Sequence, residues 1–204
     1  MPEPVDVLAA LIRVDGAPSL AVAARILASA GVPVFPCLAN GKRPLTRRGF
    51  LDASSDPARI AAWWSRTPNA NIGIPTGAAS GVVVVDVDVH GPTDGRVAWK
   101  RAADAGLVDG AVLLVRTPTG GTHAYFPATA GREQRSWQAA AAGVDFRGDG
   151  GYIIAPPSQR IIDGSVMRYR VADIAAHSVG PVDAARLRDF LDPRPAVPAR
   201  ASGG

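Results

Sequence analysis

The most strongly patterned stretch of the chain is a run of valines within residues 80–88 that ends in two aspartates one residue apart. β-Branched residues on both faces of an extended segment are typical of a central strand that is buried on both sides. Because side chains alternate along a strand, Asp86 and Asp88 point the same way if the segment stays extended that far. Paired carboxylates repel one another and are costly to desolvate. The pattern therefore indicates either a divalent-cation site or two solvated aspartates at a strand end.

Several other stretches have the apolar spacing of helices. Most of them begin at a capping residue or a proline and end at a glycine or before a proline, which are common helix boundaries. The predicted helices cover residues 5–14, 20–30, 57–67, 94–105 and 182–191.

Short apolar stretches between turn residues predict strands and three hairpins. His123 and Tyr125 share one face of the first returning strand, and Asp145 and Arg147 share one face of a later strand. This mix of hairpins and separate helices predicts an α+β fold with a mixed, mainly antiparallel sheet and flanking helices. The predicted strands are residues 32–36, 71–75, 111–117 paired with 122–126, 143–147 paired with 152–157, and a third hairpin around Asp163-Gly164.

Length and composition predict one globular domain. The 204 residues, 47% hydrophobic and 20% charged, suffice for one substantial core. We expect a helical extension over residues 1–18, the domain over 19–192 and a disordered tail over 193–204. No apolar run approaches the ~20 residues of a membrane span, and the N-terminus lacks the basic start of a secretory signal. We therefore expect a cytoplasmic protein without a membrane partner.

The cysteine content and the net charge restrict the classes of function that this protein can have. Cys37 is the only cysteine, which excludes an internal disulfide and a cysteine-based zinc site. We expect it to act as a small buried hydrophobe. The net charge of +4 and the isoelectric point of about 9.8 fit a polyanionic partner.

Residues 40–50 combine four cations with glycine, proline and one aromatic residue. This composition suits contact with phosphates or with a single nucleic-acid strand, although a solvated basic loop is equally consistent with it. Further along, Gly120 and Gly121 precede His123 and leave space for a ligand against the backbone. A lone strand histidine, by contrast, is more often structural than catalytic.

The four cations of the basic loop, residues 40–50, are Lys42, Arg43, Arg47 and Arg48.

The motifs occur in an informative order. An acid pair at residues 86–88, a histidine after a small residue at 121–123 and an acid at Asp145 resemble the three motifs of the archaeo-eukaryotic primase superfamily. The segments 41–44, 71–77, 117–126 and 143–158 are similar to the bifunctional primase-polymerase family found on plasmids, phages and integrated elements. The resemblance covers roughly residues 19–170. The chain departs from the pattern in having no cysteine- or histidine-rich zinc element between the motifs.

The resemblance implies an archaeo-eukaryotic primase-like catalytic core that acts as a DNA primase and DNA polymerase. Such an enzyme joins nucleoside triphosphates on a single-stranded DNA template and primer during replication. By the family pattern, Asp86, Asp88 and Asp145 would hold Mg²⁺ or Mn²⁺, and His123 would contact the triphosphate. Arg147, Gly120 and Gly121 are further candidates for nucleotide binding, and Lys42, Arg43, Arg47 and Arg48 for DNA binding. No segment after residue 192 resembles the helicase module often fused to such domains, so we expect a helicase or a helical accessory domain to act in trans.

Two other functions remain open from the sequence. A nucleotide-sugar glycosyltransferase also places an Asp-x-Asp at a strand end to hold a metal on a diphosphate. It does not require the motifs at His123 and Asp145. A non-catalytic nucleic-acid-binding module could keep the fold without the activity, but the three acids and the histidine are all present.

Overall fold

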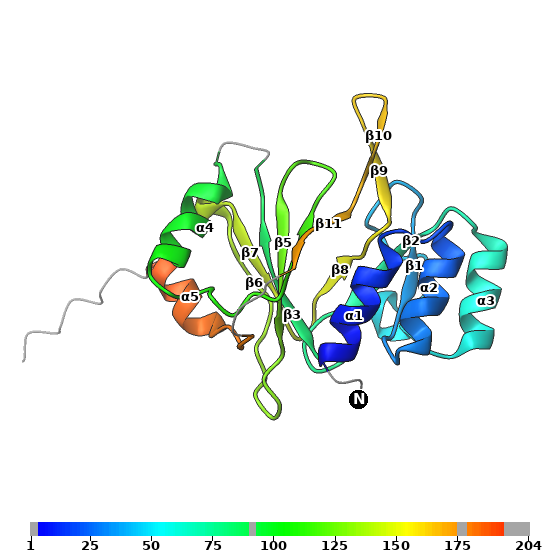
Figure 1. Ribbon diagram of the computed structural model, residues 1–204, viewed down its shortest axis with the longest axis horizontal. Coiled ribbons are helices and arrows are strands. Elements are labelled where there is room, and N and C mark those ends of the chain that lie inside the picture. Colours follow the sequence, from blue (N-terminus) through cyan, green and yellow to red (C-terminus); the bar gives the residue numbers. More distant parts are fainter. Residues whose placement is uncertain (1–3, 90–92, 175–178, 194–204) are drawn as a thin grey trace, which may run out of the picture.

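The computed structural model describes residues 4–89, 93–174 and 179–193. The part of the predicted disordered tail from residue 194 onward lies outside the described residues. Within them, a larger and a smaller antiparallel sheet are each accompanied by helices (Figure 1). This arrangement confirms the predicted α+β fold with a mainly antiparallel sheet.

The larger sheet of the described residues has six strands in the order β11-β4-β5-β3-β7-β6, with every neighbouring pair antiparallel. Its middle contains β3, and all six residues of that strand are buried, as predicted for a central strand. The strands β6 and β11 were not expected from the sequence. The six strands are β3 (Val82–Val87), β4 (Leu113–Arg116), β5 (Thr122–Pro127), β6 (Trp137–Ala139), β7 (Val144–Arg147) and β11 (Arg170–Ile174).

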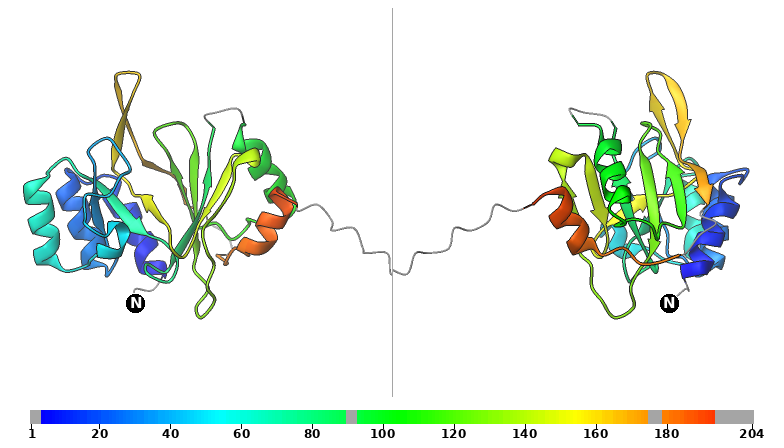
Figure 2. Two further views of the ribbon diagram at one scale, coloured as in Figure 1. Left: turned by 180° about the vertical axis from the view of Figure 1, so that it is seen from behind. Right: turned by 60° about the vertical axis from the view of Figure 1, so that its left-hand side comes forward.

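One face of this sheet packs against α4 (Gly95–Asp104) and α5 (Ala184–Leu191), which lie together at one end of the molecule (Figure 2). Alternate residues of β3, among them Val83 and Val85, bury their side chains in the hydrophobic core between this face and the two helices. The N-caps of the two helices are Asp94 and Asp183, whose carboxylates accept backbone N–H bonds at the first turn.

The smaller sheet has the order β1-β2-β8 and lies on the other side of the molecule with three helices. Together they form a second core that also takes in Val84 and Tyr125 from the larger sheet. A short 3₁₀ turn, η1 (Gly49–Asp52), lies beside β1 and β2, whereas another, η2 (Ala140–Ala142), precedes β7. The remaining elements of this part are β1 (Phe35–Cys37), β2 (Asn71–Pro75), β8 (Tyr152–Ile154), α1 (Pro4–Val14), α2 (Leu20–Ser29) and α3 (Pro57–Arg66).

The first helix is integrated with this core. Val7, Leu11 and Val14 of α1 are fully buried in it. The carboxylate of Asp15, just after α1, accepts a bond from the backbone N–H of Val171 in β11 at 2.9 Å. Residues before the predicted domain start at 19 therefore contribute to the same core as the domain.

The predicted second hairpin is wrong. Residues 144–147 form β7 beside β3, but Tyr152–Ile154 leave this sheet and pair with β2 as β8. The connecting loop is held by Thr76, whose hydroxyl donates to the Gly148 carbonyl at 2.7 Å, and by Asp149, whose carboxylate accepts from the Ala78 and Gln134 N–H groups. The chain therefore crosses between the sheets at this loop, and Ile153 and Ile154 are buried in the second core.

The other two hairpins are confirmed. β4 and β5 pair through the turn at residues 117–121, and β9 (Gln159–Ile162) pairs with β10 (Ser165–Arg168) around Asp163-Gly164. This second pair projects from the molecule as a separate hairpin (Figures 1 and 2). Among the described residues, the helices are too short and too polar to cross a lipid bilayer.

Candidate active site

Strand register brings three of the predicted site residues into one row. Asp86 of β3 lies directly opposite His123 of β5 on one side and opposite Asp145 of β7 on the other. Directly opposed residues of antiparallel strands share a face of the sheet. The exposed fractions are only 5% for Asp86, 3% for His123 and 8% for Asp145, so the row combines ionisable groups with strong desolvation.

Asp145 is held by two polar side chains. Arg147, two residues along the same strand, donates from Nη2 to Oδ2 of Asp145 at 2.7 Å. Gln138, opposite Asp145 on β6, donates from Nε2 to the same oxygen at 3.0 Å. The prediction that Asp145 and Arg147 share a face is confirmed. In this arrangement the guanidinium offsets the charge of a largely buried carboxylate.

His123 is buried and uncharged at neutral pH. Burial lowers the pKa of its imidazole and the charges of Lys42 and Arg147 lower it further, while the charge of Asp86 acts in the opposite direction. Its Nε2 lies 3.5 Å from Oδ1 of Asp86, and Nδ1 has no hydrogen-bond partner among the described residues. The contact with Asp86 is therefore one between a neutral ring and a carboxylate, and the unpartnered ring nitrogen is itself buried.

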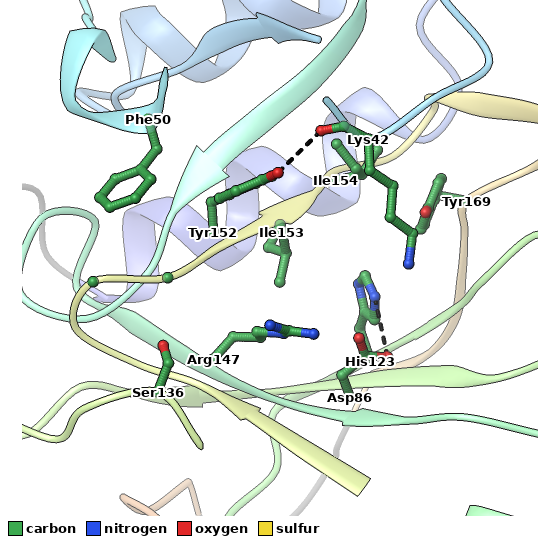
Figure 3. A pocket seen from close by; sticks show the side chains of 12 residues that line it. Lys42, Phe50, Asp86, His123, Ser136, Arg147, Tyr152, Ile153, Ile154 and Tyr169 are labelled. Carbon is green, nitrogen blue, oxygen red and sulfur yellow. Dashed lines mark hydrogen bonds and ion pairs between the residues drawn. The ribbon is translucent and has the colours of Figure 1, made fainter. Parts of the chain in front are cut away.

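A pocket of about 220 Å³ opens over Asp86 and His123 of this row, whereas Asp145 is not among its lining residues (Figure 3). Asp86, His123 and Arg147 line it from the larger sheet, and Tyr152 and its neighbours line it from β8 of the smaller sheet. The pocket thus depends on both sheets. Its other lining side chains include Lys42, Phe50, Ser136 and Tyr169.

Two aromatic rings line the pocket on the side of the smaller sheet, Phe50 from η1 and Tyr152 from β8. The Phe50 and Tyr152 rings are stacked with centroids 6.0 Å apart, and the Tyr152 hydroxyl donates to the Lys42 carbonyl at 3.2 Å. Cations, a buried acid and stacked rings in one pocket suit a ligand that carries both phosphates and an aromatic base.

Asp88 follows the end of β3 and is half-buried. Its backbone N–H donates to the Gly143 carbonyl at 2.9 Å, and its own carbonyl accepts from Gly95 at 2.8 Å. Burial raises the pKa of Tyr169, and the charges of Asp86 and Asp88 raise it further. Asp88 is thus electrostatically close to a residue of the pocket, although its side chain is not part of the pocket lining.

The carboxylates of Asp86 and Asp145 offer oxygen ligands that suit a hard cation shared with the phosphates of a substrate. Among the residues that the structure describes, no three His, Cys, Asp or Glu side chains gather closely enough to hold a metal ion. Mg²⁺, however, commonly binds through only one or two carboxylates and completes its shell with water and substrate phosphates. The opposed carboxylates of Asp86 and Asp145 fit this mode.

The two glycines before His123 have structural reasons. Gly120 has a φ of +88°, a backbone conformation that favours glycine. A Cβ on Gly121 would collide with the carbonyl oxygen of Val87, so its lack of a side chain lets this turn approach the end of β3. The space beside Gly121 is filled by backbone, and a role of either glycine in nucleotide binding stays a prediction.

The four cations of the basic loop do not gather at one place. Lys42 lines the pocket over Asp86 and His123, whereas Arg47 lines a different pocket beside α3. Arg48 forms an ion pair with Asp52, with Nε and Oδ1 2.8 Å apart. Arg43 is exposed. Lys42 is therefore the loop cation that the structure brings to the candidate site.

Sequence reasoning missed several residues around the site. Gln138 contacts Asp145 from β6, a strand that the pattern did not predict, and Ser136 lines the pocket just before it. Tyr169 and Tyr152 reach the pocket from segments distant from the acids in sequence. No local pattern marks these residues, because their positions depend on how segments distant in sequence pack together.

The larger sheet carries a row of buried acids and a neutral histidine, and the neighbouring pocket is lined by cations and aromatic rings. These features define an α+β domain suited to bind phosphorylated ligands. The family of bifunctional DNA primase/polymerase N-terminal domains matches residues 23–185, and the chain belongs to this family. Membership implies DNA primase and polymerase activity, a nucleotidyl transfer for which enzymes of the family generally use divalent metals. No curated protein matches the chain in sequence.

Proposed function

We propose that this domain performs template-directed nucleotidyl transfer by a two-metal mechanism, making or extending primers on single-stranded DNA. The biological setting that we propose is replication of a plasmid, phage or integrated element. The observation that carries the proposal is the row of Asp145, Asp86 and His123, of which Asp86 and His123 line the pocket between the two sheets. No comparable observation favours a nucleotide-sugar substrate.

Each side chain has a role that follows from its position. Asp86 and Asp145, with Asp88 beyond the strand end, would hold Mg²⁺ or Mn²⁺. When bound, the ions would stabilise charge on the attacking 3′-oxygen and the leaving pyrophosphate. Lys42 and Arg147 place positive charge in the pocket for the triphosphate.

His123 and the two aromatic rings would orient the nucleotide. As a neutral ring, His123 carries a single N–H, which would donate to a phosphate oxygen in place of the Asp86 carboxylate that lies 3.5 Å from Nε2. Phe50 and Tyr152 offer stacked ring surfaces to a base. Together these contacts would hold the reacting groups in line, which lowers the entropic part of the barrier.

The test is primer extension by Asp86→Asn and Asp145→Asn. Each substitution keeps the shape of the side chain and removes the charge that binds metal. Loss of roughly 3 kcal/mol of transition-state stabilisation would slow incorporation at least about hundredfold. Asp104→Asn is the matched control, because Asp104 is an exposed residue of α4 that pairs with Lys100. Near-normal incorporation by either site variant would show that the carboxylate row is not the catalytic centre.

A further inference from the structure

A second pocket lies beside α3, outside the candidate active site. It has a volume of about 320 Å³ and is lined by α3 together with the loop that precedes and includes η1. We call it the α3 pocket and define it by Arg47, Asp52, Arg59, Trp63, Arg66 and Thr67. None of these residues lines the pocket over Asp86.

The helical spacing of α3 places its cations and one indole on a single stripe. Arg59, Trp63 and Arg66 are separated by four and three residues, so they follow one another along the same side of the helix. Ile60 and Trp64 are buried on the core side. The Arg59 guanidinium lies over the Trp63 ring, 5.4 Å from its centroid. Guanidinium and indole thus lie together on one side of the helix, and both groups are common partners of nucleic-acid bases.

The α3 pocket carries an excess of positive charge. Its acid, Asp52, is already paired with Arg48, and hydrogen bonds from Arg48 and the nearby charges of Arg48 and Arg59 lower the pKa of that carboxyl. Within the described residues, Arg47, Arg59 and Arg66 do not form ion pairs with any carboxylate. Three exposed arginines around a half-exposed indole match the phosphates and bases of a single strand.

The loop that lines this pocket also reaches the candidate active site. Lys42 lines the active-site pocket, and Arg47, five residues later, lines the α3 pocket. Phe50, which lines the active-site pocket, follows in η1. A strand that followed this loop would meet positive charge and aromatic surface on its way from α3 to Asp86.

We propose that the α3 pocket binds the single-stranded template, with Arg47, Arg59 and Arg66 contacting phosphates and Trp63 stacking on a base. Calling this strand the template rests on the proposed function. The binding of single-stranded DNA at α3 does not depend on catalysis. Part of the DNA contact would then lie on α3, a helix outside the basic loop.

The test measures the affinity for a labelled single-stranded oligonucleotide by fluorescence anisotropy over a salt series, without metal or nucleotide. The variant is Arg59→Ala with Arg66→Ala. The charge-matched control is Arg186→Ala with Arg188→Ala on α5, at the opposite end of the molecule (Figure 1). Loss of two phosphate contacts should weaken binding about tenfold or more and lower the salt slope by about 1.4, at roughly 0.7 for each single-strand contact.

A second variant, Arg59→Lys with Arg66→Lys, keeps the charges and should keep the salt slope. Its loss of bidentate phosphate contacts should weaken binding less than the alanine substitutions do. Equal weakening by the α3 and α5 alanine variants would overturn the proposal. So would a wild-type protein that does not bind the single strand without metal. Melting temperatures verify that each variant is folded.

Primer extension at saturating template separates this inference from the proposed function. The defect of the α3 alanine variant should then be smaller than its defect at limiting template, whereas Asp86→Asn should stay slow at every template concentration. If the wild-type protein bound the strand through α3 but incorporated no nucleotide, the proposed function would fail and the α3 site would stand.

Discussion

His123 lies directly opposite Asp86 in the candidate site, and its neutrality is a consequence of where it lies. The imidazole is enclosed between the sheets, 5.6 Å from the Tyr169 ring, so desolvation outweighs the attraction of Asp86 for a proton and the pKa is lowered. A neutral imidazole donates from one nitrogen and accepts at the other. The residue is therefore suited to orient a phosphate rather than to neutralise it.

Replacing His123 with Gln should act mainly on nucleotide binding. We expect the apparent KM for nucleotide to rise about tenfold, because the loss of one hydrogen bond to a charged group costs roughly 1.5 kcal/mol. The affinity for DNA should change little. Steady-state primer extension and DNA anisotropy measure the two quantities. Tyr125→Phe is the control, since the Tyr125 hydroxyl is buried without a hydrogen-bond partner in the described part of the chain. Equal losses of nucleotide and DNA affinity in His123→Gln would point to a purely structural histidine.

Cys37 should be unreactive in the folded protein. Burial in β1 raises the pKa of its thiol to about 12, so the reactive thiolate is scarce at pH 8. Thiol labelling should be complete in denaturant and at least about a hundredfold slower without it. Because the pKa is higher in the folded state than its ordinary value of 9.0, the contribution to stability is fully present below pH 9 and is lost as the pH rises toward 12. Cys37→Ala should lack this loss, and rapid labelling of the native protein would contradict the buried position.

At the scale of elements, the candidate site depends on how closely β5 approaches β3. Six residue pairs connect the two strands, from Val82 opposite Pro127 to Val87 opposite Thr122. The turn before β5 must come close to the Val87 carbonyl for this register to reach the strand ends, and Gly121 permits that approach. The position of His123 therefore depends on a residue that need not contact any ligand.

Gly121→Ala should destabilise the protein by about 1–3 kcal/mol, as expected when a methyl group is forced into filled space. Its activity should fall as well, because the displaced turn shifts His123. Urea unfolding and primer extension measure the two effects. Gly16→Ala is the matched control: a Cβ at that position meets no atom within 4 Å and φ is not positive, so stability should change little. A Gly121→Ala protein as stable as the control would mean that the turn can move without cost.

At the scale of the whole molecule, the site is assembled from two sheets. Asp86, His123 and Arg147 come from the larger sheet, and Tyr152 comes from the smaller one. Proposed contacts to metal and triphosphate lie mostly on the first, and proposed contacts to the base lie on the second. A helicase or helical accessory domain in trans remains a proposal for what holds the rest of the template.

Extension of a primer should be faster than initiation. Starting a chain requires two free nucleotides and a template to be ordered together, whereas a paired primer already delivers its 3′-hydroxyl. We expect the isolated protein to extend a primer at least about tenfold faster than it forms dinucleotides on an unprimed template. Gel analysis with each nucleotide type and with Mg²⁺ or Mn²⁺ gives both rates. Equal rates would show that the domain orders an initiating nucleotide as well as it orders a primer end.

The local elements of this protein were predictable because their causes are local. Ser19 and Asp56 cap α2 and α3 as their positions in the sequence indicate, and each side chain accepts a backbone N–H bond in the first turn. Alternation along the strands placed His123 with Tyr125, and Asp145 with Arg147, on shared faces. The types and the order of the candidate site residues could likewise be recognised in the sequence. The family match confirms the resemblance that rests on them.

Tertiary structure decided which strands meet and which side chains complete the pocket. Residues 148–151 look like a hairpin turn, but burial of Ile153 and Ile154 beside β2 takes the chain to the other sheet. The same crossing brings Tyr152 to the pocket, while packing directs Lys42 there and leaves Arg48 paired with Asp52. Capping and side-chain alternation act over a few residues, so the sequence determines them by itself. Strand partners and pocket walls depend on burial shared by distant segments, so only the folded chain settles them.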